Sequence, residues 1–137
     1  MSHPTLPDIQ VAAFALVRNR RLLMVTARGR DVYFLPGGKI DSGETPRDAV
    51  IREVFEEVGA RVDPDSLAIY HRLALQAHGE PEGRLVAMTI FSGELLDEPV
   101  PSAEVSELHW VRLADADRCP PAGADLLYVL HRDGLID

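Results

Sequence analysis

Two apolar runs near the start of the chain are separated by a short polar break. Residues 9–17 are apolar except for Gln10, and residues 21–27 contain four consecutive large apolar side chains. Asn19 and Arg20 lie between the two runs. Short apolar runs bounded by polar turn residues are typical of buried strands. The pattern therefore predicts two strands joined in a hairpin.

A short strand, a loop and a helix are predicted next. Residues 32–35 are apolar and favour a strand, whereas Pro36-Gly37-Gly38 begins a polar loop. Thr45 followed by Pro46 is typical of a helix start, because a threonine side chain caps free N–H groups and proline suits the first helical position. Glycine commonly ends a helix. We therefore expect one helix that begins at Thr45-Pro46 and is closed by Gly59.

The second half of the chain predicts three more strands and a final helix. Strand-like apolar stretches cover residues 67–75, 85–95 and 108–113, and a last helix is expected over residues 125–131. This order of strands and helices favours an α/β fold with a mixed sheet between helices. No repeat or linker divides the 137 residues, so we expect a single domain over residues 1–137.

Charge and composition exclude several classes of protein. The 14 Lys and Arg residues are outnumbered by 22 Asp and Glu, which gives a net charge of −8 and argues against coating a nucleic acid polymer. The apolar runs are far shorter than the roughly 20 residues of a membrane span. The start of the chain lacks the pattern of a secretory signal, and the single Cys119 cannot form an internal disulfide. We expect a cytoplasmic protein.

The predicted helix carries three glutamates close together on one side. With Glu53 at zero, Glu56 falls at about −60° and Glu57 at about +40°. The opposite side is expected to face the core through Ile51, Val54, Phe55 and Val58. Like charges at this spacing destabilise a helix, and a divalent cation would remove that cost. The cluster favours a Mg²⁺ or Mn²⁺ site, with a solvated acidic surface as the alternative.

These glutamates belong to a longer pattern of glycines and charged residues. Gly38 is followed after five residues by Glu44, and after seven more by Arg52-Glu53, Glu56-Glu57 and Gly59. This run, residues 38–60, resembles the Nudix box, G-x5-E-x7-R-E-U-x-E-E-x-G-U, in which U is a bulky aliphatic residue. Every glycine and charged position matches, and only Ala60 is smaller than the pattern requires. The resemblance implies a Nudix-type α/β/α sandwich.

The resemblance also implies an activity and a metal site. Nudix hydrolases cleave a diphosphate bond in a nucleoside polyphosphate or a nucleotide-linked diphosphate, and they usually require Mg²⁺ or Mn²⁺. By analogy, Glu53, Glu56 and Glu57 would bind the metal together with the carbonyl of Gly37, and Glu53 and Glu56 would take part in catalysis. The adjacent glycines, Gly37 and Gly38, would allow this close approach of the backbone.

Further residues are expected to support this chemistry. Arg52 is four residues before Glu56, so it is expected to orient Glu56 or Glu44 through an ion pair. Glu44 would otherwise act as an acidic residue at the helix N-terminus. In this family a catalytic base often comes from a loop outside the box.

An acidic loop resembling that region covers residues 102–111. Glu104 is the predicted base, with Glu107 and Glu98 as alternatives. Nearby, Trp110 is expected in the core. Tyr33, Phe34 and Phe91 are candidates either for the core or for a wall that contacts the nucleotide.

Two residues that mark particular Nudix subfamilies are missing after the box, and this restricts the expected substrate class. Residues 67–77 contain no proline, a marker of ADP-ribose hydrolases, and Tyr70 is too near the box to be the tyrosine marker of dinucleoside polyphosphate hydrolases. A nucleoside-triphosphate pyrophosphohydrolase is therefore the first prediction. An ADP-ribose or nucleotide-sugar pyrophosphatase, or a noncatalytic nucleotide-binding sensor, is the alternative. The expected partner is a small nucleotide, neither a nucleic acid polymer nor a membrane, and a homodimer is common in the family.

Overall fold

The structure is a computed structural model that describes residues 8–102 and 105–137. Within them the strands are β1 (Ile9–Ala15), β2 (Val17–Arg18), β3 (Arg21–Ala27), β4 (Gly37–Lys39), β5 (Ala68–Gln76), β6 (Leu85–Ser92) and β7 (Val105–Val111). The helices are α1 (Pro46–Val58) and α2 (Pro121–Arg132), and Pro64–Ser66 and Leu113–Arg118 form short 3₁₀ helices. Neither α1 nor α2 is long and apolar enough to cross a membrane.

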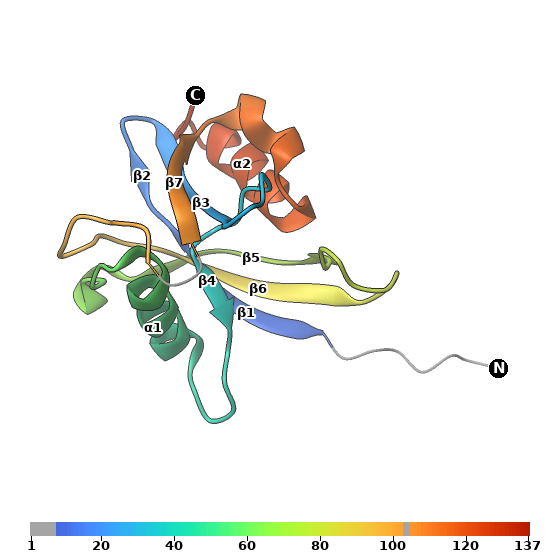
Figure 1. Cartoon of the computed structure of the whole chain (residues 1–137), viewed down its shortest axis with the longest axis horizontal. Coiled ribbons are helices and arrows are strands. Elements are labelled where there is room, and N and C mark those ends of the chain that lie inside the picture. Colours follow the sequence, from blue (N-terminus) through green and yellow to red (C-terminus); the bar gives the residue numbers. More distant parts are fainter. Residues whose placement is uncertain (1–7, 103–104) are drawn as a thin grey trace.

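The strands form two sheets (Figure 1). One is mixed, with the order β4-β1-β6-β5 and a parallel pair between β1 and β6, whereas the antiparallel sheet has the order β2-β3-β7. The predicted hairpin turn is present between β2 and β3, and Asn19 and Arg20 take the positive φ values that a two-residue turn requires. β1, however, leaves this hairpin and pairs with β4 and β6. The mixed sheet is confirmed, and a second sheet accompanies it.

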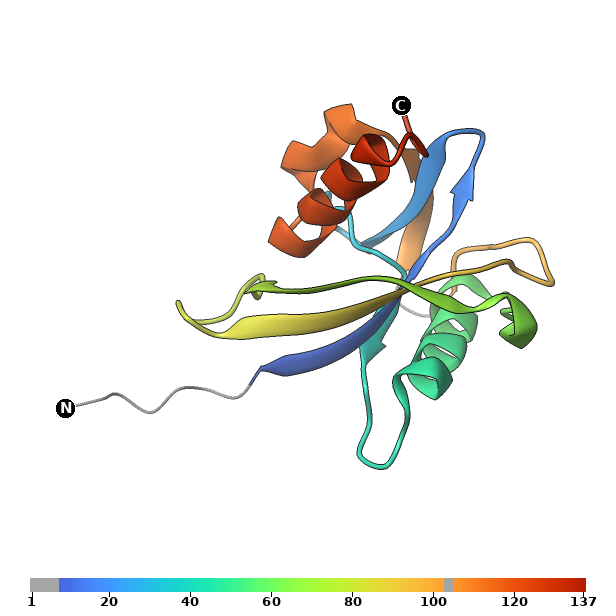
Figure 2. The same cartoon turned by 180° about the vertical axis from the view of Figure 1, so that it is seen from behind.

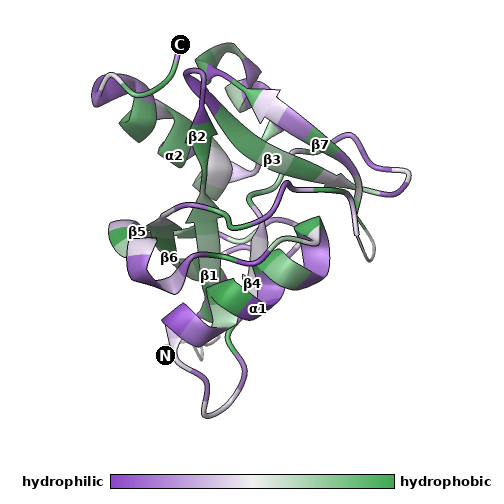
Figure 3. Ribbon diagram, turned by 90° about the vertical axis from the view of Figure 1, so that its left-hand side faces the viewer, coloured by the Kyte–Doolittle hydropathy of each residue, from purple (hydrophilic) through white to green (hydrophobic). Residues whose placement is uncertain are grey.

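The two helices cover opposite faces of the mixed sheet (Figures 1 and 2). Alternate residues of β1 divide between the two cores: Ala12 and Phe14 pack with residues of α1, and Ala13 and Ala15 with residues of α2. The hydrophobic colour runs along β1 and β3, whereas α1 carries both colours (Figure 3). This arrangement confirms the α/β/α sandwich.

Helix α1 begins and ends where its sequence predicts. The Thr45 hydroxyl accepts a hydrogen bond from the Asp48 N–H at 3.1 Å, and Gly59 adopts a left-handed conformation with φ 63°. α2 begins earlier than expected, at Pro121, and Leu113 belongs to a 3₁₀ helix and not to a strand. Both differences lie at element ends, where sequence patterns are least informative.

The orientation of α1 differs from the expected one. Its buried residues are Ala49, Val50, Val54 and Val58. On the same helical projection these residues centre about 40° from Glu57. Glu53 and Glu57 therefore border the core, whereas Glu56 lies on the far side of the helix and is exposed. Phe55 is 55% exposed, so its assignment to the core was wrong. The reason lies in β4, where Gly37 and Gly38 have no side chains and leave room for the glutamates.

Strand β4 occupies residues that were expected to form a loop. Residues 32–35 form only an isolated bridge, between Phe34 and Val25, and the strand forms instead at Gly37–Lys39 beside β1. A Cβ at Gly37 would lie 2.2 Å from the Ala12 carbonyl oxygen, so only glycine allows this approach.

The position of Trp110 also differs from the one predicted from the sequence. It is 36% exposed on β7, an edge strand, with the Arg18 guanidinium carbon 5.8 Å from the ring centroid, so its assignment to the core was wrong.

Candidate active site

Arg52 ties the loop after β4 to the outer edge of α1. Its guanidinium donates to both carboxylate oxygens of Glu44, at 2.9 and 2.8 Å, and to Glu53 at 2.7 Å. Glu56 lies further away, at 3.5 Å. The hydrogen bonds from Arg52 and from the Asp41 N–H hold the pKa of Glu44 at about 2, so this carboxylate stays charged. Arg52 therefore pairs with both of the alternatives expected for it, Glu44 and Glu56, and also with Glu53 and, at 3.4 Å, with Asp41.

Glu57 joins the helix to the glycine strand. Its carboxylate accepts a hydrogen bond from the Gly37 N–H at 2.8 Å. Burial raises the pKa of Glu57 to about 7, with the bond from Gly37 opposing the shift and the charges of Glu53 and Glu56 adding to it. A carboxylate in this position favours a nearby cation, because a positive charge would relieve the cost of burying the anion.

Gly38 provides the space that Glu53 occupies. A Cβ at this position would lie 2.5 to 2.7 Å from the carboxylate atoms of Glu53. A larger residue would displace that carboxylate, so the glycine leaves room for Glu53 in its present position.

The carboxylates fit a hard divalent cation in their chemistry. Glu53, Glu56 and Glu57 offer only oxygen donors, from one rigid helix and into one cavity. Within residues 8–102 and 105–137, however, no three His, Cys, Asp or Glu side chains are grouped closely enough to hold an ion. Glu53 is held by Arg52 and Glu57 by Gly37. Metal binding would therefore require these carboxylates to turn toward a common centre.

A cavity of about 720 Å³ extends from these glutamates. Its remaining walls are largely apolar, and they come from segments far apart in the sequence, including Ile9, Val11, Val25, Tyr33, Phe34, Gln76, His78, Val86, Met88 and Gly123. Tyr33 and Phe34 thus line the cavity, whereas Phe91 is 5% exposed and belongs to the core beside α1. One space therefore combines an acidic end with apolar and aromatic walls.

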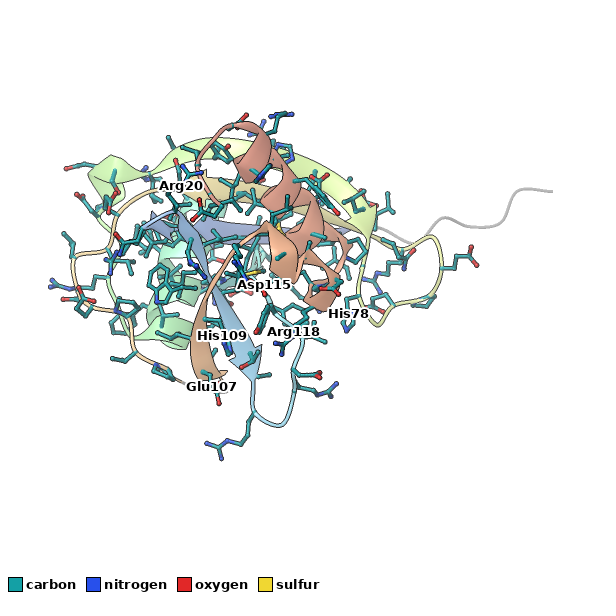
Figure 4. The ribbon with its side chains drawn as sticks, turned by 90° about the horizontal axis from the view of Figure 1, so that it is seen from above. Arg20, His78, Glu107, His109, Asp115 and Arg118 are labelled. Carbon is teal, nitrogen blue, oxygen red and sulfur yellow. The ribbon has the colours of Figure 1, made fainter. Side chains whose placement is uncertain are left out.

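Aromatic contacts fix two parts of the wall. The centroids of the Tyr33 and His109 rings lie 4.7 Å apart. The Arg118 guanidinium carbon lies 4.2 Å from the centroid of the Tyr33 ring. His109 comes from β7 and Arg118 from the 3₁₀ helix before α2, and both are labelled in Figure 4. The Phe34 and His78 rings form a T-shaped pair with their centroids 5.7 Å apart. These contacts hold Tyr33 and Phe34 in place without any ligand.

The three candidates for the catalytic base have different positions. Glu104 lies outside the described residues. Glu107, on β7, has a side chain that is 71% exposed and lies 3.6 Å from the His109 ring nitrogen. The Glu98 side chain is 86% exposed and pairs with Arg18 at 3.4 Å. Neither Glu98 nor Glu107 is among the described residues that line the cavity.

Sequence reasoning missed much of the cavity wall. Residues such as Gln76, Met88 and Gly123 carry no motif, and they meet only because β5, β6 and α2 pack around the same space. Strand alternation could have indicated which residues share a face, but not which face borders the glutamates.

Comparisons with known proteins show which family this chain resembles in sequence and in fold. The family model described as NUDIX domain matches residues 8–132. The chain is 28% identical to the 8-oxo-dGTP diphosphatase of Escherichia coli K12 over 131 residues, 90% of this chain and 97% of that protein. It is 34% identical to the 8-oxo-dGTP diphosphatase of Haemophilus influenzae, over 89% of this chain and 90% of that protein.

A solved structure shares the fold. The MutT protein from Methanosarcina mazei superposes with a TM-score of 0.72 and 22% identity, covering 93% of this chain and 96% of the other. The chain belongs to the Nudix family. Members of this family act on phosphoanhydride bonds of small nucleotide substrates as pyrophosphohydrolases, and they generally need divalent metal ions.

Proposed function

We propose that this protein is a nucleoside-triphosphate pyrophosphohydrolase that uses Mg²⁺ or Mn²⁺. The observation that carries the proposal is the single cavity in which the glutamates of α1 face a largely apolar enclosure. Phosphates need cations and charged groups, whereas a nucleobase needs flat apolar surface. Its similarity to two 8-oxo-dGTP diphosphatases over nearly their full length supports the same class and makes 8-oxo-dGTP the first substrate to test.

In this proposal Glu53, Glu56 and Glu57 bind the metal, with the Gly37 carbonyl as a further ligand. A bound Mg²⁺ or Mn²⁺ would neutralise phosphate charge and lower the pKa of the attacking water. Arg52 orients Glu53. Its bidentate pair with Glu44 fixes the position of the loop before α1 relative to the helix.

The apolar end of the cavity would exclude water and enclose the nucleobase beside Tyr33 and Phe34. In the reaction, the water oxygen forms a bond to a phosphorus of the bridge and the bridging P–O bond breaks. The proton of the water passes to a carboxylate, for which we propose Glu104.

A substrate panel tests the proposed function. The protein is incubated with Mg²⁺ or Mn²⁺ and with 8-oxo-dGTP, the ordinary nucleoside triphosphates, ADP-ribose and a nucleotide sugar, and the products are resolved by chromatography. A nucleoside monophosphate and pyrophosphate are expected from at least one triphosphate. Turnover of ADP-ribose or the nucleotide sugar alone would instead assign the alternative pyrophosphatase class. Tight binding without turnover would indicate a nucleotide sensor.

The proposed base is tested by paired variants. Glu104→Gln is expected to lower kcat strongly with little change in substrate affinity, whereas Glu107→Gln should retain most of the activity. A large loss only in Glu107→Gln would move the role to that residue. Small losses in both, with Glu98→Gln also active, would place the base among the box glutamates, with Glu53 next.

We further propose that the protein acts in the cytoplasm, where nucleoside triphosphates are made and used, as one Nudix domain over residues 1–137. A homodimer is part of the same proposal. Light scattering coupled to gel filtration distinguishes a dimer from the 15.1 kDa monomer.

A further inference from the structure

The loop between β5 and β6, residues 77–84, forms part of the cavity wall. Ala77, His78 and Glu80 all line the cavity. The loop closes with a backbone hydrogen bond from Ala77 N–H to the Arg84 carbonyl at 2.9 Å, and Gly79 and Gly83 take left-handed conformations with φ 75° and 92°. Two more backbone hydrogen bonds lie within the loop, from the Glu80 N–H to the Ala77 carbonyl at 3.3 Å and from the Arg84 N–H to the Pro81 carbonyl at 3.0 Å.

The side chain of Gln76 adds hydrogen bonds that the loop backbone does not make by itself. Its amide nitrogen lies within hydrogen-bonding distance of three loop carbonyls, at 3.2 Å to Ala77, 3.3 Å to Glu80 and 3.1 Å to Pro81. Its amide oxygen accepts the Gly83 N–H at 2.9 Å. One partly buried side chain at the end of β5 thus reaches both halves of the loop. Only an amide of this length offers donor and acceptor together at that position.

This loop stands at the opposite end of the cavity from the glutamates. In the paired strands, Gly38 lies opposite Ala12, and Ala12 lies opposite Thr89. Arg84, the last loop residue, precedes Thr89 by five positions, which is about 16 Å along a strand. A nucleotide with its phosphates at the α1 glutamates therefore directs its other end toward the loop. There His78 belongs to the loop (Figure 4), and its ring centroid lies 5.7 Å from that of Phe34.

We propose that Gln76 is a positioning residue that sets the nucleoside specificity of this enzyme by fixing the loop that carries His78. The inference rests on the proposed function, because it concerns the non-phosphate end of the same substrate. Gln76 acts through the loop, and the chemistry at the glutamates does not depend on it. Loss of the Gln76 side chain should therefore weaken substrate binding and reduce the enzyme's preference for one base over another. The rate of the chemical step should change little.

The test compares Gln76→Ala and Gln76→Glu with the wild type, using the best triphosphate from the substrate panel at saturating Mg²⁺. Both variants are expected to raise KM by roughly fivefold or more with kcat within about threefold, and to narrow the differences in kcat/KM among the four bases. Gln10→Ala is the matched control, because Gln10 is an exposed glutamine of β1 in the same sheet that does not line the cavity. It should leave KM unchanged.

A second comparison shows whether Gln76 acts through His78. If it does, Gln76→Ala should raise KM much less in a His78→Ala background than in the wild type. Fully additive effects on KM would overturn the proposed route, and so would a fall in kcat with KM unchanged in the single variants.

Amide hydrogen exchange provides a readout that does not need activity. The Gly83 N–H should exchange faster in Gln76→Ala, whereas Gln76→Glu keeps an acceptor oxygen and should retain more protection. Unchanged exchange at Gly83 in Gln76→Ala would overturn the positioning role. A wild type inactive on the whole panel would overturn the proposed function, and the Gly83 exchange would still decide whether Gln76 holds the loop.

Discussion

Helices α1 and α2 have nearly the same length, 13 and 12 residues, and cover opposite faces of one sheet. They differ in their caps and in the contacts that their polar side chains make with the sheet. α1 has a side-chain cap at its start, a glycine at its end and three glutamates, of which Glu53 and Glu57 border its buried face. α2 has no side-chain cap hydrogen bond, and it buries Leu126, Leu127 and Leu130.

The polar contacts of α2 with the sheet join side chains and not backbone. Asp125 pairs with His71 of β5 at 3.1 Å, and Asp133, which follows the helix, accepts a hydrogen bond from Tyr70. In α1, by contrast, the Glu57 carboxylate reaches the sheet backbone itself, at Gly37. The difference lies in the partner strands, because glycines in β4 let charged side chains approach the core. We therefore propose that α1 carries the chemistry and that α2 contributes mainly to stability.

Removing the metal should have the largest effect on the α1 side. Excess EDTA is expected to abolish hydrolysis, because the glutamates alone would repel a polyphosphate. Added Mg²⁺ or Mn²⁺ should restore the rate, measured by pyrophosphate release. Full activity in EDTA would show that the glutamates do not serve as a metal site.

Glu57→Gln should separate activity from stability. Loss of this charged ligand is expected to lower kcat by at least about 10²-fold. The melting temperature of the metal-free protein should stay the same or rise, because a like charge is removed while an amide oxygen still accepts the Gly37 N–H.

Asp48→Asn is the control for this variant, since Asp48 is an exposed acid in the first turn of the same helix. It should keep kcat within about twofold. A near-normal kcat in Glu57→Gln would favour the alternative interpretation, in which the three glutamates form only a solvated acidic surface.

Leu127→Ala tests the other half of the comparison. Leu127 is fully buried in α2, so the substitution is expected to lower the free energy of unfolding by about 2–5 kcal/mol. Urea unfolding measures this loss, and kcat below the unfolding transition should stay within a few fold. If kcat instead fell as far as in Glu57→Gln, the division of roles between the helices would be wrong.

The smallest effect is expected at Arg61 and Asp97, an exposed ion pair just after α1. Two guanidinium hydrogen bonds of 3.0 Å and one from the Arg61 N–H hold the pKa of Asp97 at about 2, below its usual 3.8. The pair therefore stabilises the fold above pH 3.8, and this contribution disappears as the pH falls through 2. Asp97→Asn should lower the urea midpoint slightly at pH 7, and the difference from wild type should vanish near pH 2. A difference that persists unchanged at pH 2 would contradict this assignment.

The sequence by itself determined α1, its limits and its glutamate pattern. Thr45, Pro46 and Gly59 act on backbone groups within a few residues of themselves, so their effect is local and readable from the order of residues. The ion pair of Arg52 with Glu56 follows from the i, i+4 geometry of a helix. The pair with Glu44 joins the helix to the loop before it.

Only the tertiary structure decided how that helix is used. It turned Glu57 toward Gly37 and Phe55 toward solvent, because the packing of α1 depends on the strand beneath it. It also made a strand of Gly37–Lys39, where proline and glycine had suggested a loop. Strand pairing and the cavity join residues as distant as Ile9, Gln76 and Gly123, and contacts between such distant residues leave no local pattern, since they depend on the packing of the complete chain.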